Sequence, residues 1–163
     1  MVPPLLPDRA RDRPAASSEA AQRRMVRQGR RDTAPELALR RELWSRGLRY
    51  RVDATPTPGR RRADLVFARA RVAVYVDGCF WHRCPEHSTT PTRNRAWWAA
   101  KLDANVARDR ATDDELEAAG WVVVRVWEHE DPLEAAERVQ GAVNSSAQGG
   151  RRSPTIRPSR PLR

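Results

Sequence analysis

Residues 76–87 read VDGCFWHRCPEH and gather most of the reactive side chains of this protein. The whole sequence has 2 cysteines and 3 histidines, and both cysteines and two of the histidines lie in this dodecamer. The residues before it, 72–76, form a continuous apolar run, which is typical of a buried strand. The dodecamer is therefore predicted to be a loop that follows a buried strand and carries metal ligands, an acid and two aromatic side chains.

Apolar periodicity on both sides of this loop predicts an α/β domain with a mixed central sheet flanked by helices. A helix is expected to begin in the segment DTAPE at residues 32–36, because Asp and Thr cap helices and proline suits the first turn. Strands are expected at 48–52, 63–67, 72–76 and 121–127, a long helix at 93–119 with a break near 111–113, and a last helix from 131 to about 143. The second and third strands are close enough in sequence to pair as a hairpin.

The net charge of +10 is concentrated at the two ends of the chain. Residues 1–31 contain eight arginines and three acids, and residues 145–163 contain five arginines and no acid. We expect a disordered basic arm at 1–22, one folded domain at 23–144 and a disordered basic tail at 145–163. Such arms suit a polyanion, most simply nucleic acid, although solvated segments without a partner have the same composition.

The sequence predicts a cytoplasmic protein without membrane contact. No apolar run approaches the length of a membrane span, and the N-terminal residues are too proline-rich for a signal peptide. In the cytoplasm, two cysteines separated by four residues and interleaved with histidines favour metal ligation over a disulfide.

Acidic residues at strand ends predict a site for a hard cation. Asp64 lies at the start of one hairpin strand and Asp77 at the end of the next, so both are expected at the same end of the sheet. Carboxylates placed in this way can share Mg²⁺, and Glu36 in the first turn of the preceding helix could add a direct or water-mediated ligand. Each acid taken alone is also an ordinary strand-end or helix-start residue.

The soft ligands predict a second metal site of a different kind. Cys79, Cys84 and His87 supply three ligands for zinc, which in a closed structural site takes four in a tetrahedron. The fourth is either His129, at the end of the 121–127 strand, or His82. We expect His129, which completes a Cys2His2 set and leaves His82 free for chemistry.

Aromatic side chains next to the ligands allow two interpretations. Phe80 and Trp81 either pack in the core or insert between the bases of a duplex. Trp97 and Trp98 point in two directions on their helix, so one is expected in the core and the other available to DNA. The remaining tryptophans, Trp44, Trp121 and Trp127, are expected in the core.

The acids resemble the pattern of the PD-(D/E)xK, or restriction-endonuclease-like, superfamily. Arg62-Ala63-Asp64 occupies the place of the proline-aspartate pair, and Asp77-Gly78-Cys79 that of (D/E)xK. Cys79 stands at the lysine position, and His82 is the candidate to replace the missing group.

Taken together, these residues resemble the very-short-patch repair (Vsr) endonucleases, bacterial nickases of T:G mismatches. The resemblance runs from about Met25 to Glu134. The matching stretches are RDTAPE at 31–36, Asp64-Leu65-Val66, GCFWH at 78–82, Trp98 with Lys101 and Asn105, Arg108-Asp109, and Gly120-Trp121 with Val126-Trp127-Glu128. It implies a restriction-endonuclease-like fold with a structural zinc, and Mg²⁺-dependent cleavage of one DNA strand 5′ to the mismatched thymine.

The resemblance also implies roles for single residues. Asp64 binds Mg²⁺, His82 assists the attacking water and Glu36 orders metal-bound waters. Asp77, where this chain departs from the best-known pattern toward the general PD-(D/E)xK form, is expected as a second Mg²⁺ ligand. Contacts with DNA are expected from Phe80, Trp81 and Trp98, which wedge into the duplex, from Met25 near the minor groove, and from Lys101. The expected protein is a monomer whose partners are T:G-mismatched double-stranded DNA and mismatch-repair proteins.

Departures from the best-known family pattern keep two other functions open. This chain has Val76-Asp77 where threonine and histidine are familiar, and His129 where a cysteine is familiar. The alternatives are a nuclease with another substrate on the same fold and a zinc-stabilised DNA-binding module without catalysis.

Overall fold

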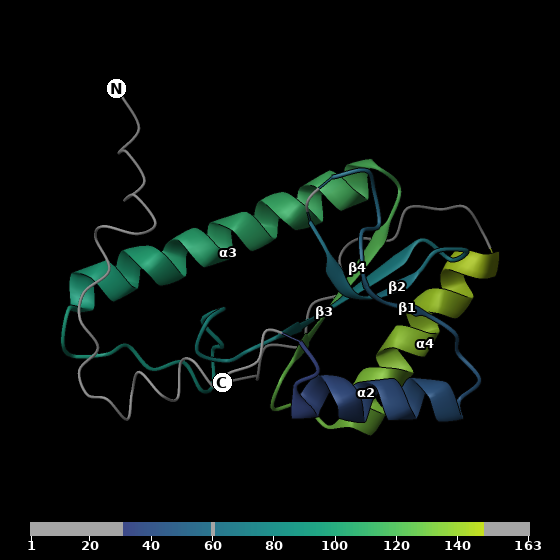
Figure 1. The fold of residues 1–163 in the computed structure, drawn as a ribbon, viewed down its shortest axis with the longest axis horizontal. Helices are drawn as coiled ribbons and strands as arrows, with labels where there is room; N and C mark the ends of the chain where they lie inside the picture. The colour runs from purple at the N-terminus through teal and green to yellow at the C-terminus, as the bar shows by residue number, and fades with distance from the viewer. Residues whose placement is uncertain (1–30, 60, 149–163) are drawn as a thin grey trace.

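The structure, a computed structural model, describes residues 31–59 and 61–148 (Figure 1). The helices and strands in chain order are α2 (Ala34–Ser45), β1 (Arg51–Ala54), β2 (Ala63–Phe67), β3 (Val72–Asp77), α3 (Arg95–Ala118), β4 (Val122–Trp127) and α4 (Pro132–Gln148). The predicted order of elements is confirmed. Met25, the arm at 1–22 and residues 149–163 lie outside the described part of the chain.

One four-stranded sheet with the order β1-β2-β3-β4 forms the centre. β1 and β2 pair antiparallel, as do β2 and β3, which confirms the hairpin. β3 and β4 pair parallel, with Val72 opposite Val122 and Asp77 opposite Trp127, and α3 lies in the crossover between them. Because parallel strands end at the same edge, the loop after β3 and the residues after β4 come together.

Helices cover both faces of the sheet (Figure 1). On one face, α2 and α4 pack over alternate strand residues in a cluster that includes Leu39, Leu43, Leu65, Val74, Val124 and Val139. On the other face, α3 contributes Leu116 to a smaller cluster with Val66, Ala73 and Val123. The sheet is therefore the middle layer, and residues of odd number in β3 and β4 face α3.

The long helix α3 is continuous, so the predicted break near 111–113 is wrong. The polar residues that suggested it are buried and bonded instead of exposed: the Thr112 hydroxyl donates to the Arg108 carbonyl at 2.8 Å, and Asp113 accepts from Arg125. The helix gives way at Gly120, whose φ of +81° favours glycine.

Other boundaries differ by a few residues. The first strand begins at Arg51, later than the predicted 48–52, because Leu48 and Tyr50 pack against the core ahead of the strand. α4 continues to Gln148, so the first residues of the expected tail are helical; no glycine or proline occurs between 142 and 148 to end it earlier. None of the described helices has the length and apolar character needed to cross a membrane.

The tryptophans follow the predictions in part. Trp121 is buried, as expected, but Trp127 is only half-buried. Trp44 is 57% exposed, so its placement in the core is wrong. It lies on the outer side of α2, where the Arg49 guanidinium stacks over its ring at 3.7 Å from the centroid.

Candidate active site

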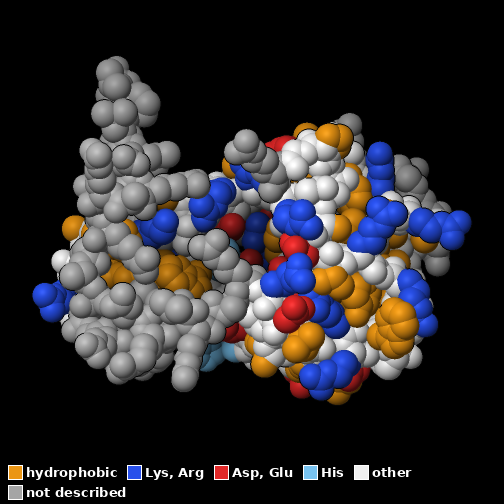
Figure 2. Space-filling view, viewed as in Figure 1, with side chains coloured by type: hydrophobic (Ala, Val, Ile, Leu, Met, Phe, Trp, Pro, Cys, Tyr) orange, Lys and Arg blue, Asp and Glu red, His pale blue; other side chains and the backbone are white. Residues whose placement is uncertain are grey.

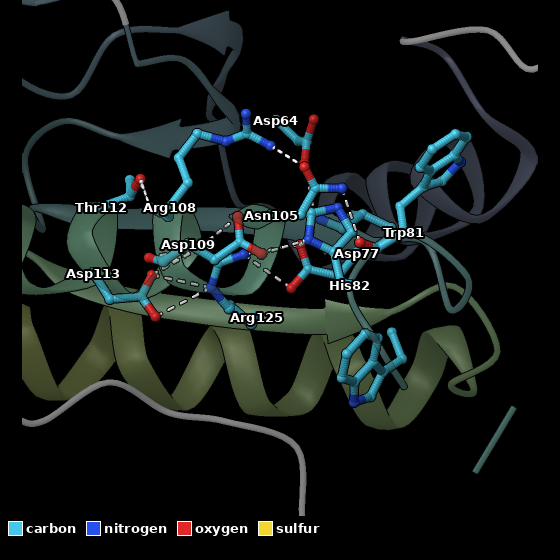
Figure 3. Close-up of polar contacts among 12 residues, drawn as sticks. Asp64, Asp77, Trp81, His82, Asn105, Arg108, Asp109, Thr112, Asp113 and Arg125 are labelled. Atoms are coloured by element: carbon cyan, nitrogen blue, oxygen red, sulfur yellow. Dashed lines mark hydrogen bonds and ion pairs between the residues drawn. The ribbon is translucent and has the colours of Figure 1, made fainter. Parts of the chain in front are cut away.

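A polar cluster occupies the α3 side of the sheet, where the apolar packing stops. Alternation along the strands places Asp77 of β3 and Arg125 of β4 on this side, opposite Asp109 and Asp113 of α3 (Figure 3). In Figure 2, acidic and basic side chains lie recessed between the surface over α3 and the surface over α2 and α4. Asp77, Asp113 and Arg125 are buried, so the cluster is set into the molecule.

Arg125 is the centre of this cluster. Its Nη1 donates to both carboxylate oxygens of Asp77 at 2.9 Å. Its Nε and Nη2 donate to Asp113 at 3.0 and 2.9 Å, and Nη2 also reaches the backbone carbonyl of Asp109 at 3.3 Å. Burial alone would lower the pKa of Arg125, but the charges and hydrogen bonds of Asp77 and Asp113 raise it, so the guanidinium stays charged.

His82 lies beside this cluster, half-buried in the loop after β3. Its Nδ1 is 2.6 Å from Asp109 Oδ2 and 3.7 Å from Asp77 Oδ1. An ionised carboxylate only accepts hydrogen bonds, so Nδ1 carries the proton and Nε2 of the neutral ring is an acceptor. Burial alone would lower the pKa of His82, but the hydrogen bond to Asp109 and the charges of Asp77 and Asp109 outweigh it and raise that pKa.

Asp64 lies on β2 next to the cluster, in an environment that disfavours its ionised form. Its Oδ2 accepts the backbone N–H of Val76 at 2.7 Å. Burial raises the pKa of Asp64 to about 6, opposed by the Val76 hydrogen bond and reinforced by the charges of Glu36 and Asp77. The influence of Glu36 and Asp77 shows that the three predicted acids are brought into one electrostatic environment. Negative charge there is not fully balanced by the protein.

The three acids differ in what already holds them. Glu36 is 2% exposed and accepts from the backbone N–H of Asp32 at 2.9 Å and from the Arg40 guanidinium. Asp77 is buried against Arg125, and burial raises its pKa despite the opposing charge of Arg125. Within the described residues, Asp64 differs from the other two in that its one hydrogen bond comes from a backbone N–H and it has no arginine partner.

The cysteines and histidines form a separate cluster that could hold a metal ion. The ligand atoms of Cys79, Cys84, His87 and His129 all lie within 4.8 Å of one another. Nδ1 of His129 is 3.0 Å from Cys79 Sγ and 3.7 Å from Cys84 Sγ, close to the roughly 3.5 Å expected between ligands of a tetrahedral zinc. The structure brings His129 to this group, as predicted, and His82 is not a member.

The loop that joins the two clusters is fastened to the neighbouring strand. The backbone N–H of Cys79 donates to Glu128 Oε1 at 2.7 Å, and the backbone N–H of His82 donates to the Gly78 carbonyl at 3.1 Å. Asn105 of α3 donates to the Trp81 carbonyl at 3.1 Å. Three hydrogen bonds therefore fix the loop backbone from Cys79 to His82.

The aromatic side chains of the loop gather with those of α3. The ring centroid of Phe80 is 5.0 Å from that of Trp81 and 5.4 Å from that of Trp98, and Trp97 packs edge-on against Trp98 at 4.9 Å. All four are half-buried and none belongs to the two core clusters, so the expectation that one of Trp97 and Trp98 is core is wrong. Lys101 lies exposed one turn further along α3.

Sequence reasoning gave no role to Arg125, Asp113 or Asn105, and it left Asp109 as part of a matching stretch. One signal was available: an arginine at position 125 interrupts a run of valines that is otherwise fully apolar. A charge in a buried strand requires a partner, and acids spaced by four residues at 109 and 113 lie on one face of a helix.

Comparisons with known proteins identify the family. Residues 16–87 match the model of the family described as DNA mismatch endonuclease Vsr. The chain is 44% identical over 129 residues to the type II nicking enzyme V.NaeI of Lentzea aerocolonigenes, covering 77% of this chain and 78% of that protein. It is 37% identical over 116 residues to the type II nicking enzyme V.NmeDIP of Neisseria meningitidis serogroup C, covering 68% and 77%.

A third relative carries the family's own name. The chain is 39% identical over 100 residues to the DNA mismatch endonuclease Vsr of Escherichia coli strain K12, covering 60% of this chain and 62% of that protein. The extent of the match to the nicking enzyme of Lentzea and the family match over the cysteine- and histidine-rich loop point to the same family. The chain belongs to the Vsr family of DNA mismatch endonucleases and is an endonuclease, a hydrolase that nicks DNA.

Proposed function

We propose that this protein nicks one strand of double-stranded DNA at a T:G mismatch, by hydrolysis of the phosphodiester 5′ to the mismatched thymine. The observation that carries the chemical part is the pair of His82 and Asp109, 2.6 Å apart and next to the half-buried Asp64. The resemblance to Vsr endonucleases supports the T:G substrate and a restriction-endonuclease-like arrangement of the sheet. The proposed active form is a monomer.

Magnesium suits the residues around Asp64. The carboxylate has acceptor capacity beyond its bond to Val76. Burial, reinforced by the charges of Glu36 and Asp77, raises its pKa to about 6, and a bound cation would favour the ionised form. Asp64 is our proposed direct ligand, and Glu36, held by Arg40, would order water around it. Bound Mg²⁺ would lower the pKa of a coordinated water and stabilise the charge that develops on the phosphate.

His82 is the proposed general base. Asp109 fixes the proton on Nδ1, so Nε2 can take a proton from the attacking water. The water oxygen forms a bond to phosphorus, the bond to the leaving sugar oxygen breaks, and that oxygen takes up a proton. The charge of Asp109 stabilises the imidazolium that forms on His82.

Zinc is the metal that we propose for the Cys79, Cys84, His87 and His129 cluster. Two sulfur and two nitrogen ligands fit a closed tetrahedral site, which is structural and has no open position for a substrate. Without a metal, burial and the neighbouring Cys84 raise the pKa of the Cys79 thiol to about 12, so metal binding would release protons. The site would hold the loop that carries His82.

The aromatic cluster is the proposed contact with the mismatch. Phe80 and Trp81, in the same loop as His82, pack edge-on or tilted against Trp98 of α3, outside the two core clusters. Half-buried rings on a metal-fastened loop can insert between base steps without a large ordering cost. Lys101 on α3 and Met25 are further proposed DNA contacts, and mismatch-repair proteins are further proposed partners.

Nicking of synthetic duplexes tests the substrate. With Mg²⁺ and a label on either strand, we expect a single nick, in the thymine-containing strand, on a T:G duplex. A matched T:A duplex should be cut about 10- to 100-fold more slowly, since one base pair typically contributes about 1–3 kcal/mol to discrimination. Equal cleavage of T:A, or preference for a branched duplex, would assign the nuclease another substrate. Binding without cleavage in Mg²⁺ or Mn²⁺ would make it a DNA-binding module.

Removal of the proposed base tests the mechanism. His82→Ala is expected to slow single-turnover nicking about 10²- to 10⁴-fold, because general-base catalysis contributes that much. Asp109→Asn should also nick slowly, because a neutral amide neither fixes the proton on Nδ1 of His82 nor stabilises the imidazolium. Asp114→Asn, an exposed acid on the same helix, is the control and should nick normally. A wild-type rate in His82→Ala would remove His82 from the mechanism.

A further inference from the structure

Arg125 is a cation placed where the fold would otherwise put an apolar side chain. It is 4% exposed in the middle of β4, whose other residues from 122 to 126 are valines. A buried guanidinium is costly unless its donors are paired, and a well-packed apolar residue often stabilises a fold as well as a buried ion pair. Its presence therefore calls for an explanation beyond stability.

The guanidinium joins two elements at fixed geometry. One edge of its planar group binds both oxygens of Asp77 on β3, and the other binds Asp113 on α3. The same Nη2 reaches the backbone carbonyl of Asp109 and is 3.8 Å from Asp109 Oδ1. Because a guanidinium presents its donors in a rigid fork, it sets the position of α3 against β3 at this point.

Asp77 and Asp109, which Arg125 contacts, are also the two carboxylates next to His82. Asp109 Oδ2 is 2.6 Å from Nδ1 of the ring, and Asp77 Oδ1 is 3.7 Å from the same atom. Figure 3 shows Asp77, Asp109 and His82 converging on one side of Arg125, with Asp113 on the other. A shift of Arg125 would therefore move both groups that orient the imidazole.

We propose that Arg125, anchored by Asp113, is a positioning residue for DNA nicking, and that Asp77 acts as its counter-charge instead of as a Mg²⁺ ligand. The inference rests on the proposed function, in which His82 is the base. Arg125 keeps Asp109 in place, Asp109 keeps the proton on Nδ1, and Nε2 stays directed to the reacting water. Both oxygens of Asp77 already accept hydrogen bonds of 2.9 Å from a buried arginine, so its negative charge is balanced within the protein.

Single-turnover nicking and DNA affinity measure the effect of Arg125. Arg125→Met should slow nicking roughly 10- to 100-fold, the usual range for groups that orient a ligand or base, while the Kd for the duplex changes little. Arg125→Lys should recover part of the rate, because an ammonium keeps the charge but not the fork. Arg46→Met is the matched control: this half-buried arginine ties α2 to α4 through Gln140 and should affect stability alone. A wild-type rate in folded Arg125→Met overturns the proposal.

The state of the His82 ring gives a readout without magnesium or substrate. In zinc-loaded wild-type protein, nitrogen-detected NMR of the imidazole should show a single Nδ1–H form for His82, identified by its absence in His82→Ala. Arg125→Met should show a mixture of the two tautomers at a pH where the ring is neutral. An unchanged Nδ1–H signal in that variant would contradict the positioning role.

The role of Asp77 is separated from metal ligation by a magnesium titration. Asp77→Asn should be slow at saturating Mg²⁺ with an unchanged half-saturating concentration, and Asp77→Asn/Arg125→Met should be no slower than either single variant. An increase of tenfold or more in the half-saturating concentration for Asp77→Asn, without one for Arg125→Met, would make Asp77 a metal ligand and overturn the proposal.

A triple variant without the three buried charges separates a loss of activity from a loss of folding. Arg125→Met alone leaves two buried carboxylates uncompensated, whereas Asp77→Asn/Arg125→Met/Asp113→Asn removes all three charges at similar volume. If the triple variant folds, it should still nick slowly. A wild-type rate would show that Asp77, Arg125 and Asp113 have a purely structural role. The two levels of inference remain distinct: a fast His82→Ala defeats the proposed function, whereas a slow His82→Ala with a fast triple variant defeats only the role of Arg125.

Discussion

Asp64→Asn is expected to abolish nicking and at the same time to stabilise the magnesium-free protein. Loss of activity follows if Asp64 is the direct ligand of the catalytic cation, because a neutral amide is a poor substitute for a carboxylate. The stabilisation follows from the environment of Asp64, where burial and the charges of Glu36 and Asp77 raise its pKa to about 6. At neutral pH Asp64 is thus ionised in the folded protein, and its ionisation lowers the stability of the magnesium-free fold.

The sign and the pH range of this effect are fixed by the direction of the shift. The folded protein holds the Asp64 proton more tightly than the unfolded chain, so the cost of ionisation grows as pH rises from about 4 to 6 and is constant above. The difference from the ordinary value of 3.8 corresponds to roughly 3 kcal/mol at pH 8. The Asn side chain can still accept from Val76, so most of this cost should be relieved.

Thermal and urea unfolding of Asp64→Asn and wild type, in buffer without magnesium, measure this gain. The variant should be more stable at pH 8, and its advantage should shrink as the pH is lowered toward 5. Asp114→Asn, which changes an exposed acid in the same way, should show neither effect. Reduced stability of Asp64→Asn at pH 8 would show that the folded protein stabilises the Asp64 carboxylate without a cation.

Cys84→Ser is expected to release the metal and disorder the loop that carries His82. Cys84 is completely buried, and its Sγ lies 3.7 Å from His129 Nδ1 and 3.9 Å from His87 Nδ1. Serine cannot replace a thiolate ligand, and metal binding in small domains contributes directly to folding. We expect a melting temperature lower by on the order of 10 °C, since several kcal/mol would be lost.

Metal analysis and calorimetry test this expectation. The wild-type protein should contain about one zinc per chain and Cys84→Ser much less, with nicking lost as His82 moves away from Asp109. Ser88→Ala, a small change in the same loop, should keep zinc and stability. If the wild-type protein is folded without zinc, or Cys84→Ser keeps its melting temperature, the structural metal site is rejected.

Local sequence pattern was sufficient for most of the architecture. The mainly apolar runs at 63–67, 72–76 and 121–127 predict the strands β2, β3 and β4, because strands covered on both faces consist mostly of apolar residues. The loop with Cys79 and Cys84 could be recognised because metal ligands are rare and close in sequence. The boundaries of β1 and α4 were less exact, since weak polar segments can end an element at several places.

Contacts between distant segments could only be found in the tertiary structure. Asp77 read as a metal ligand in the sequence, but its bonds to Arg125 join residues 48 apart, and no periodicity reports such a pair. Trp44 satisfied the helical pattern of α2 and is nevertheless 57% exposed, with the Arg49 guanidinium over its ring.

The sequence by itself determined the order of elements, the cysteine- and histidine-rich loop as a candidate metal site, and the resemblance to the family. Those features depend on residue type and on spacing within one element or loop. The tertiary structure decided that Asp77 pairs with Arg125 whereas Asp64 accepts a backbone N–H, that His129 and not His82 joins the cysteines, and that Arg125 links both neighbours of His82. The physical reason is that hydrogen bonds and charges act over a few ångströms in space, whatever the separation along the chain.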